Sequence, residues 1–156
     1  MSEMIRFLES EAEFIQMMGR KCSVAGFVLK HGRAFEPRKL PKNLRLHKGR
    51  IKGCFRNAAL AALRDPSLTY VEGYAASIIP VLHAWCVDPD GGLLEVTWGK
   101  PGDEYYGIPF QTRFLRRSLL EAGYYGLIDQ WKNNWPLLRG KYPKREWLKP
   151  MKKGKA

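Results

Sequence analysis

The sequence predicts an α+β domain in which helices pack on an antiparallel sheet. Segments with helical periodicity and segments rich in β-branched and aromatic residues occur in separate blocks instead of alternating along the chain, which is typical of α+β proteins. The chain has 156 residues and is 45% hydrophobic, enough for one domain with a sizeable core. We therefore expect a single domain over residues 1–138 and a basic, flexible C-terminal tail over 139–156.

The N-terminal part begins with a predicted amphipathic helix over residues 2–18. Ser2 can cap this helix, Gly19 can end it, and apolar side chains recur on one face, namely Met4, Phe7, Leu8, Phe14, Ile15 and Met18. Residues 22–29 form a short apolar run that predicts a strand. The prolines and glycines of residues 30–53 predict a long basic loop, and loops of that length are usually functional or disordered.

The clearest helix pattern follows in CFRNAALAALRD, residues 54–65, which is rich in alanine and leucine and stops before Pro66. Three strands are predicted next, over 68–75, 78–87 and 93–98. The hexapeptide YYGIPF then ends an irregular stretch and is interpreted as a turn at a sheet edge. Two helices are predicted to close the domain, over 111–122 and 126–138.

The turn DPDG at residues 88–91 sets the register of the last two predicted strands. Its Asp, Pro and Gly positions are typical of a type I turn with a glycine bulge. Counting outward from this turn places His83 and Trp85 on the same face as Glu95 and Thr97. The backbones of His83 and Glu95 are then diagonal neighbours about 7 to 8 Å apart. The glutamate side chain can span that distance and orient the imidazole.

Cys54 begins the alanine-rich helix, where unpaired backbone N–H groups and the helix dipole favour a thiolate. Gly53 lets the chain turn there without a side chain crowding the thiol. Cys22 and Cys86 belong to predicted strands and are interpreted as small core residues. Because the three cysteines lack metal-ligand spacing, we expect free thiols and no metal site. No motif for a nucleotide or flavin is present, so no cofactor is predicted.

A helix-start cysteine, a histidine on a strand and a carboxylate on the next strand, in that order, resemble the papain-like and transglutaminase-like superfamily of cysteine enzymes. The match is to the transglutaminase-like branch, in which His-Ala-Trp is followed after a short turn by Asp-x-Thr. This chain has HAW at residues 83–85, EVTW at 95–98 and GCF at 53–55. The match covers roughly residues 50–110. Glu95 stands where the family usually has Asp, and Phe55 where it often has Trp.

The resemblance implies a core in which a central helix carrying Cys54 packs on a small antiparallel sheet carrying His83 and the acid. It also implies that His83 takes the thiol proton and that the thiolate forms an acyl-enzyme with a protein or peptide amide. Glu95 is the predicted third member of the triad, and the alternatives are Asp88, Asp90 or no third residue. The chemistry stays open between hydrolase, protease, deamidase and transglutaminase-like transferase.

Further residues are candidates for the oxyanion site or the cleft. The backbone N–H of Cys54 and the side chain of Asn57 are predicted oxyanion donors. Trp85 is predicted to shield the imidazole–carboxylate bond from water, and either Tyr105 or Tyr106 to line the cleft. Each of these residues also has a purely structural interpretation, as a helix-cap thiol, a core histidine or a packing side chain.

The charge of the chain predicts a polyanionic partner, either an acidic protein surface or nucleic acid. Lys and Arg number 27 against 15 Asp and Glu, for a net charge of +12. Two segments concentrate the excess, and their bases are Lys30, Arg33, Arg38, Lys39, Lys42, Arg45, Lys48, Arg50, Lys52 and Arg56, then Arg139, Lys141, Lys144, Arg145, Lys149, Lys152, Lys153 and Lys155. Lys48, Arg50, Lys52 and Arg56 adjoin Cys54 and are the candidate partner-binding residues. Solvated charge that only maintains solubility is the alternative.

A second functional hypothesis follows from the same charge: a basic binding module of phage or mobile-element origin, which holds nucleic acid or blocks a host protein without catalysis. Neither hypothesis involves a membrane, because no run approaches the roughly 18 apolar residues of a membrane span. Residues 1–6 do not resemble a secretory signal, so a cytoplasmic location is expected.

Overall fold

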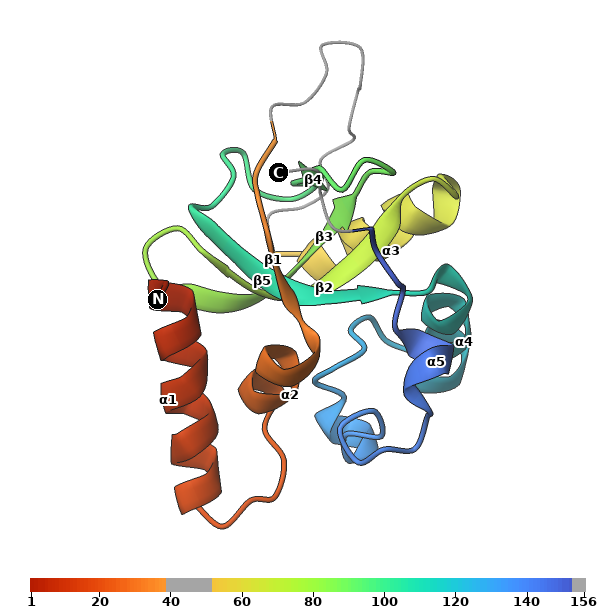
Figure 1. Ribbon diagram of the computed structural model, residues 1–156. Helices are drawn as coiled ribbons and strands as arrows, with labels where there is room; N and C mark the ends of the chain where they lie inside the picture. The colour runs from red at the N-terminus through yellow and green to blue at the C-terminus, as the bar shows by residue number, and fades with distance from the viewer. Residues whose placement is uncertain (39–51, 153–156) are drawn as a thin grey trace.

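A five-stranded antiparallel sheet forms the centre of the fold (Figure 1). The computed structural model describes residues 1–38 and 52–152. The strand order across the sheet is β1-β5-β2-β3-β4, and the strands span Arg33–Phe35 (β1), Thr69–Ala76 (β2), Pro80–Val87 (β3), Leu93–Leu94 (β4) and Glu104–Phe110 (β5). The sheet curls, and the architecture is α+β, as the sequence predicts.

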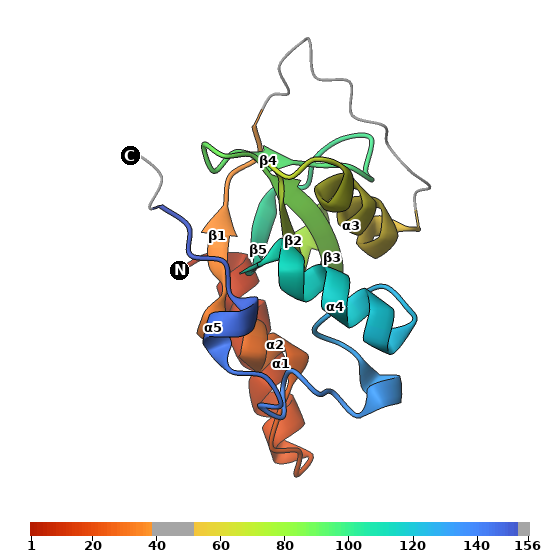
Figure 2. The ribbon, with the colours of Figure 1, turned by 90° about the vertical axis from the view of Figure 1, so that its right-hand side faces the viewer.

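The helices contribute to a single large core cluster with one face of this sheet. They span Glu3–Met17 (α1), Val24–His31 (α2), Cys54–Arg64 (α3), Thr112–Ala122 (α4) and Lys144–Trp147 (α5), with a 3₁₀ turn at Trp131–Asn133 (η1). Figures 1 and 2 show α1 and α2 side by side below the sheet, with α3 near β3 and β4.

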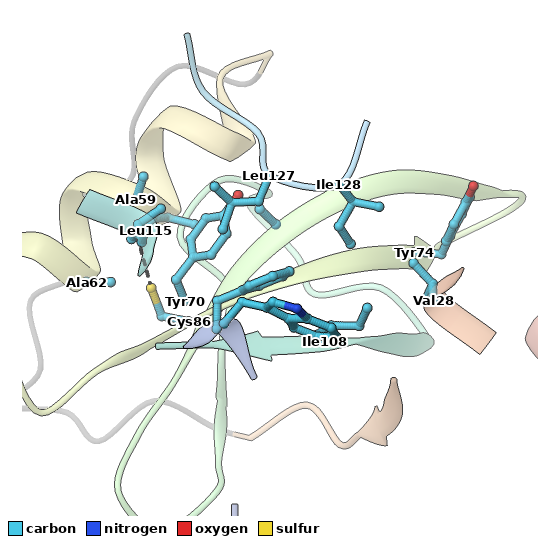
Figure 3. Close-up of a cluster of buried hydrophobic side chains, with 14 of the residues drawn as sticks. Val28, Ala59, Ala62, Tyr70, Tyr74, Cys86, Ile108, Leu115, Leu127 and Ile128 are labelled. Atoms are coloured by element: carbon cyan, nitrogen blue, oxygen red, sulfur yellow. Dashed lines mark hydrogen bonds between the residues drawn. The ribbon is translucent and has the colours of Figure 1, made fainter. Parts of the chain in front are cut away.

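Strand alternation divides the core into two clusters. On β3, Ala84 and Cys86 face the helix-side cluster, and Figure 3 shows Cys86 directed toward α3. The Cys86 thiol donates a hydrogen bond of 3.3 Å to the carbonyl oxygen of Ala58. Trp85 and Val87 belong to a smaller cluster on the other face. Because side chains two residues apart on a strand face the same side of the sheet, His83 lies on the same face as Trp85 and this smaller cluster.

Five predicted elements are confirmed because their signals are local. The helix over 2–18 is α1, and Ser2 caps it by accepting a 3.2 Å hydrogen bond from the Ile5 N–H. The helix over 54–65 is α3, and the strands over 68–75 and 78–87 are β2 and β3. The helix over 111–122 is α4, which ends at Gly123 in the left-handed conformation.

The predicted strand over 22–29 is wrong, because these residues begin helix α2. Ser23 caps the helix by accepting a 2.8 Å hydrogen bond from the Gly26 N–H, and Ala25 and Val28 are buried at helical spacing. A short apolar run fits a strand and a buried helix equally well, so its periodicity alone does not separate the two.

The predicted loop over 30–53 is wrong in its first part. Residues 30–31 end α2, and residues 33–35 form strand β1, which pairs with β5. Residues 39–51 of this loop lie outside the described residues.

The segment containing YYGIPF is also not an edge turn. It belongs to β5, which lies between β1 and β2. Its proline, Pro109, faces Val71 of β2 at a point where β1 no longer extends alongside.

The predicted helix over 126–138 is replaced by irregular backbone with a single 3₁₀ turn. Gly126 has a φ of 104°, and Asn134 and Trp135 have positive φ angles of 58° and 48°, which a right-handed helix does not contain. The predicted strand over 93–98 is only two residues long and ends at Leu94. On α1, Phe14 and Met18 of the predicted apolar face are 56% and 66% exposed, so this face is buried only near its start.

The C-terminal segment, where a flexible tail is expected over 139–156, packs on the domain through Tyr142, Trp147 and Leu148, and residues 153–156 lie outside the described residues. Trp147 is only 3% exposed and belongs to the large core cluster. Gln111, at the start of α4, donates its backbone N–H to the Trp147 carbonyl oxygen at 2.9 Å and its side-chain amide to the carbonyl oxygens of Arg145 and Leu148. This segment is therefore attached to the domain through Trp147 and its neighbours, and its described basic side chains are exposed.

Candidate active site

Cys54 is the first residue of α3 and is half-buried. Gly53 precedes it as the N-cap residue, and no side chain caps the helix by a hydrogen bond. The amide of Asn57, one turn into the helix, donates a 3.1 Å hydrogen bond to the Thr97 hydroxyl. The first turn of α3 therefore lies against the segment that follows β4, and no described side chain caps the N–H groups of that turn.

His83 lies in the middle of β3, opposite Gly73 of β2. Its side chain is almost completely buried, with 1% of the residue exposed. The imidazole stacks on the indole of Trp98, with ring centroids 4.1 Å apart and an interplanar angle of 21°. Because β4 ends at Leu94, the segment 95–98 is free to bend over β3 and enclose the histidine.

Glu95 is buried and makes four hydrogen bonds, which use both of its carboxylate oxygens. Its Oε2 lies 2.9 Å from His83 Nε2 and accepts a 2.7 Å hydrogen bond from the Tyr105 hydroxyl. Its Oε1 accepts hydrogen bonds from the backbone N–H groups of Thr97 and Trp98, at 2.9 and 3.1 Å. A carboxylate held in this way has one orientation, with Oε2 directed at the imidazole.

The turn geometry behind this contact agrees with the sequence prediction. Gly91 has a φ of 85°, and the N–H of Asp88 donates a 2.9 Å hydrogen bond to the carbonyl oxygen of Gly92, so residues 88 and 92 pair as expected. The ladder then continues only to the pair Cys86–Leu94. Glu95 therefore reaches His83 from a bend that follows the strand, one residue beyond the ladder.

The pKa values of His83 and Glu95 shift in directions that favour an ion pair. Burial on its own lowers the pKa of His83, but hydrogen bonds with Cys54 and Glu95, together with the charges of both groups, raise it to about 8. Burial disfavours the ionised form of Glu95, yet its hydrogen bond to His83 and the imidazole charge outweigh burial and lower the pKa of this carboxyl. With Nε2 bound to Glu95, Nδ1 is the imidazole nitrogen left for the Cys54 thiol.

The other two carboxylates that sequence reasoning kept as alternatives lie elsewhere. Asp88 forms a 2.8 Å ion pair with Arg38 and organises the turn by accepting from the N–H groups of Asp90 and Gly92. Asp90 is 84% exposed at the tip of this turn. The structure thus brings Cys54, His83 and Glu95 together, and it places Asp88 and Asp90 at the turn.

Three of the predicted site residues have structural roles. Asn57 connects α3 to Thr97 as described above. Trp85 is fully buried, and a Cβ added at Gly107 would lie 2.7 Å from its ring, so it packs tightly over β5. Tyr106 packs on the helix side of the sheet, where its hydroxyl donates to the Leu29 carbonyl oxygen at 3.4 Å.

Tyr105, the neighbour of Tyr106, is the residue that contacts Glu95. Sequence reasoning missed this contact because residues 104–110 were expected to be irregular, so the alternation of a strand was not applied to the two tyrosines. Trp98, which covers the imidazole, was identified only as part of the EVTW motif. The position of Trp98 at the end of a predicted strand was the one feature of the sequence that could have indicated this contact with the imidazole.

Glu72 is a second buried carboxylate that the sequence did not single out. It accepts hydrogen bonds from the Tyr70 hydroxyl and from the backbone N–H groups of Leu127 and Ile128, at 2.7 to 2.9 Å. These bonds hold the irregular segment after α4 against β2. A Cβ added at Gly126 of this segment would lie 3.9 Å from the Phe55 ring, so the segment passes beside the first turn of α3.

The candidate partner-binding residues are only partly described. Lys48 and Arg50 lie outside the described residues. Lys52 and Arg56 are both exposed and lie two residues before and two residues after Cys54. Positive charge therefore borders the thiol along the chain, and the polyanionic partner remains a prediction.

The described residues show neither a metal site nor a membrane-spanning helix. In the described ranges, His, Cys, Asp and Glu side chains form no group of three or more able to hold a metal ion. None of the helices in the described part of the chain has the length and apolar character needed to span a bilayer. Comparison of the chain with protein-family models, curated proteins and solved structures finds no match. The transglutaminase-like resemblance therefore stays a prediction.

Proposed function

We propose that the protein is a cysteine-dependent acyl-transfer enzyme that acts on protein or peptide amide bonds through Cys54, His83 and Glu95. One observation carries this proposal: Glu95 Oε2, which Tyr105 also contacts, lies 2.9 Å from His83 Nε2, and the Cys54 thiol at the helix start lies close enough to the imidazole to raise its pKa. Nucleophilic catalysis requires a nucleophile within hydrogen-bonding reach of a base, and a third group that orients this base.

The reaction begins when Nδ1 of His83 accepts the thiol proton of Cys54. Glu95 stabilises the resulting imidazolium, and the thiolate sulfur attacks the amide carbonyl carbon. The oxyanion that forms is stabilised by backbone N–H groups at the start of α3, Cys54 among them, since no side chain caps them. The imidazolium then returns its proton to the leaving amine as the C–N bond breaks, which leaves an acyl-enzyme.

The second half of the cycle decides the reaction class. Water attacking the thioester, with His83 as base, makes the protein a hydrolase or deamidase, and an incoming amine makes it a transferase. In both cases the thiol regains its proton from His83 and the acyl product leaves. We also propose that α3, β3 and the segment 95–98 form a core of the papain or transglutaminase type, on the strength of the order of the triad along the chain.

Alkylation by iodoacetamide tests the proposal directly, because the chain contains its own control. Cys22 is exposed and Cys86 is buried, so exposure alone predicts that Cys22 reacts fastest. An activated Cys54 reacts faster than Cys22 near neutral pH, and His83→Asn removes that advantage. Peptide mapping by mass spectrometry after timed labelling measures the three rates.

Two outcomes distinguish the competing interpretations. If Cys54 labels no faster than Cys22, and His83→Asn changes nothing, the enzyme proposal is wrong and the non-catalytic binding module is favoured. If Cys54 is activated, incorporation of a fluorescent amine into a glutamine-containing protein substrate identifies a transferase, and release of ammonia without incorporation of the amine identifies a deamidase. Cys54→Ala serves as the inactive control in both assays.

A further inference from the structure

A cleft of about 890 Å³ lies between α1, α2 and the C-terminal segment. Its volume falls within the roughly 300–1,000 Å³ typical of small-molecule sites. None of Cys54, His83 and Glu95 lines it, so it is separate from the candidate active site. An inference about this cleft therefore does not rest on the proposed acyl transfer.

Four cationic side chains line the cleft and come from three parts of the chain: Arg20 and Lys21 from the α1–α2 connection, Lys30 from α2 and Lys144 from α5. No Asp or Glu is among the described residues that line it. Within the described ranges, none of these four cations forms an ion pair. Basic residues commonly occur in the last turn of a helix, which accounts for Lys30 but not for the three cations contributed by other segments.

Acids line two adjoining cavities: Glu11 and Asp129 line one of them together with Arg20 and Lys21, and Glu121 lines the other. Asp129 is already engaged there, since it accepts a 2.6 Å hydrogen bond from the Trp135 indole N–H. The side of the cleft around Lys30 and Lys144 has no such acid in its lining. This side has a positive potential that an anion would neutralise.

His31 lines the same side of the cleft. Its ring packs against the rings of Phe27 and Trp147, with centroid separations of 4.7 and 5.3 Å. Its Nδ1 is buried and has no hydrogen-bond partner among the described residues, an uncommon state for a buried polar atom. Burial, followed by the charges of Lys144 and Lys30, lowers the pKa of His31, which shows that both lysines lie within electrostatic reach of the ring.

Apolar side chains also line the cleft, among them Ile15, Phe27 and Leu138. We propose that the cleft binds a small organic phosphate, with the phosphate group at His31, Lys30 and Lys144 and the organic body against these apolar side chains. A phosphate matches the site because it carries close to two negative charges and three acceptor oxygens. It can therefore pair with both lysines at once, whereas a single carboxylate offers fewer acceptors and less charge.

Calorimetric titration of the full-length protein with ADP tests this assignment, with pyrophosphate and adenosine as the two partial probes. We expect ADP to bind, pyrophosphate to bind more weakly because it lacks the organic body, and adenosine to show no binding. Lys30→Gln with Lys144→Gln should weaken ADP binding by about tenfold or more, since two charged donors are lost. His31→Phe, which keeps the aromatic packing with Phe27 and Trp147, should weaken ADP and pyrophosphate alike.

The matched control is Lys100→Gln with Lys132→Gln, two exposed lysines outside the cleft lining, which lowers the net charge by the same amount. Retention of ADP affinity in this control supports a defined site. An equal loss in both double variants would show general charge attraction and overturn the proposal. Absence of ADP and pyrophosphate binding up to about 10 mM, where a millimolar site is detected, would overturn it too. Tight binding of a single-stranded oligonucleotide without ADP binding would replace it with a nucleic-acid surface.

Discussion

Replacing Glu95 with Gln tests whether the carboxylate sets the state of the catalytic imidazole. The amide keeps one oxygen that can accept from the backbone N–H groups of Thr97 and Trp98. Its NH₂ group then faces His83 Nε2, where Oε2 of the carboxylate was. An NH₂ donor at Nε2 favours the tautomer with its proton on Nδ1, and that tautomer cannot accept the proton of Cys54.

The size of the effect follows from the pKa of His83. Its rise from 6.5 to about 8 corresponds to about 2 kcal/mol, at 1.36 kcal/mol per pKa unit. Cys54 and Glu95 both contribute to this rise and must also offset burial, which acts in the opposite direction. If Glu95 supplies about half of the net effect, its loss costs about 1 kcal/mol in the stability of the imidazolium–thiolate pair. We therefore expect Glu95→Gln to slow alkylation of Cys54 by roughly fivefold to tenfold near pH 7.

The assay measures the rate of Cys54 alkylation as a function of pH, in wild type, Glu95→Gln and Asp88→Asn. Asp88→Asn is the matched control, since its carboxylate pairs with Arg38 at the turn and not with His83. Near-ultraviolet circular dichroism confirms that each variant is folded. The reasoning is refuted if a folded Glu95→Gln reacts at the wild-type rate, or if Asp88→Asn is the slower of the two variants.

Three further predictions concern the packing and the pH dependence of stability. Gly107→Ala should lower the free energy of unfolding by about 1–3 kcal/mol in urea titrations, because the new Cβ meets the Trp85 ring at 2.7 Å. Gly99→Ala is the control, because an added Cβ there would meet no described residue within 4 Å apart from its chain neighbours. Trp147→Ala should cost about 3–5 kcal/mol, and an unchanged urea midpoint would show that the C-terminal segment is peripheral. The pKa of His83 is higher in the folded state than the unfolded value of 6.5, so its stabilisation is complete below pH 6.5 and is lost as the pH rises through about 8. Unfolding titrations from pH 6 to 9 should therefore show a fall of about 2 kcal/mol that is absent in His83→Asn.

Elements with strong local signals agreed with the sequence prediction. The alanine-rich pattern of α3 and the DPDG turn each depend on residues close together in the chain, so the local sequence was sufficient to predict both elements. The predictions for 22–29 and 126–138 were wrong for the opposite reason. The first run fits two periodicities, and the second is held in irregular backbone by Glu72, more than fifty residues earlier in the chain.

In the candidate site, too, the contacts set by local sequence could be predicted and those set by long-range packing could not. Chain order and turn chemistry were enough to pair His83 with Glu95, because a tight turn limits which residues of its two arms can meet. Long-range packing was needed to bring Tyr105 to the same carboxylate, since that contact depends on β5 lying between β1 and β2 and on which side of the sheet each of its residues faces. Long-range packing likewise brought Lys144 to the cleft beside α2, because a side chain at the end of the chain reaches a helix near its start only when the core between them has formed.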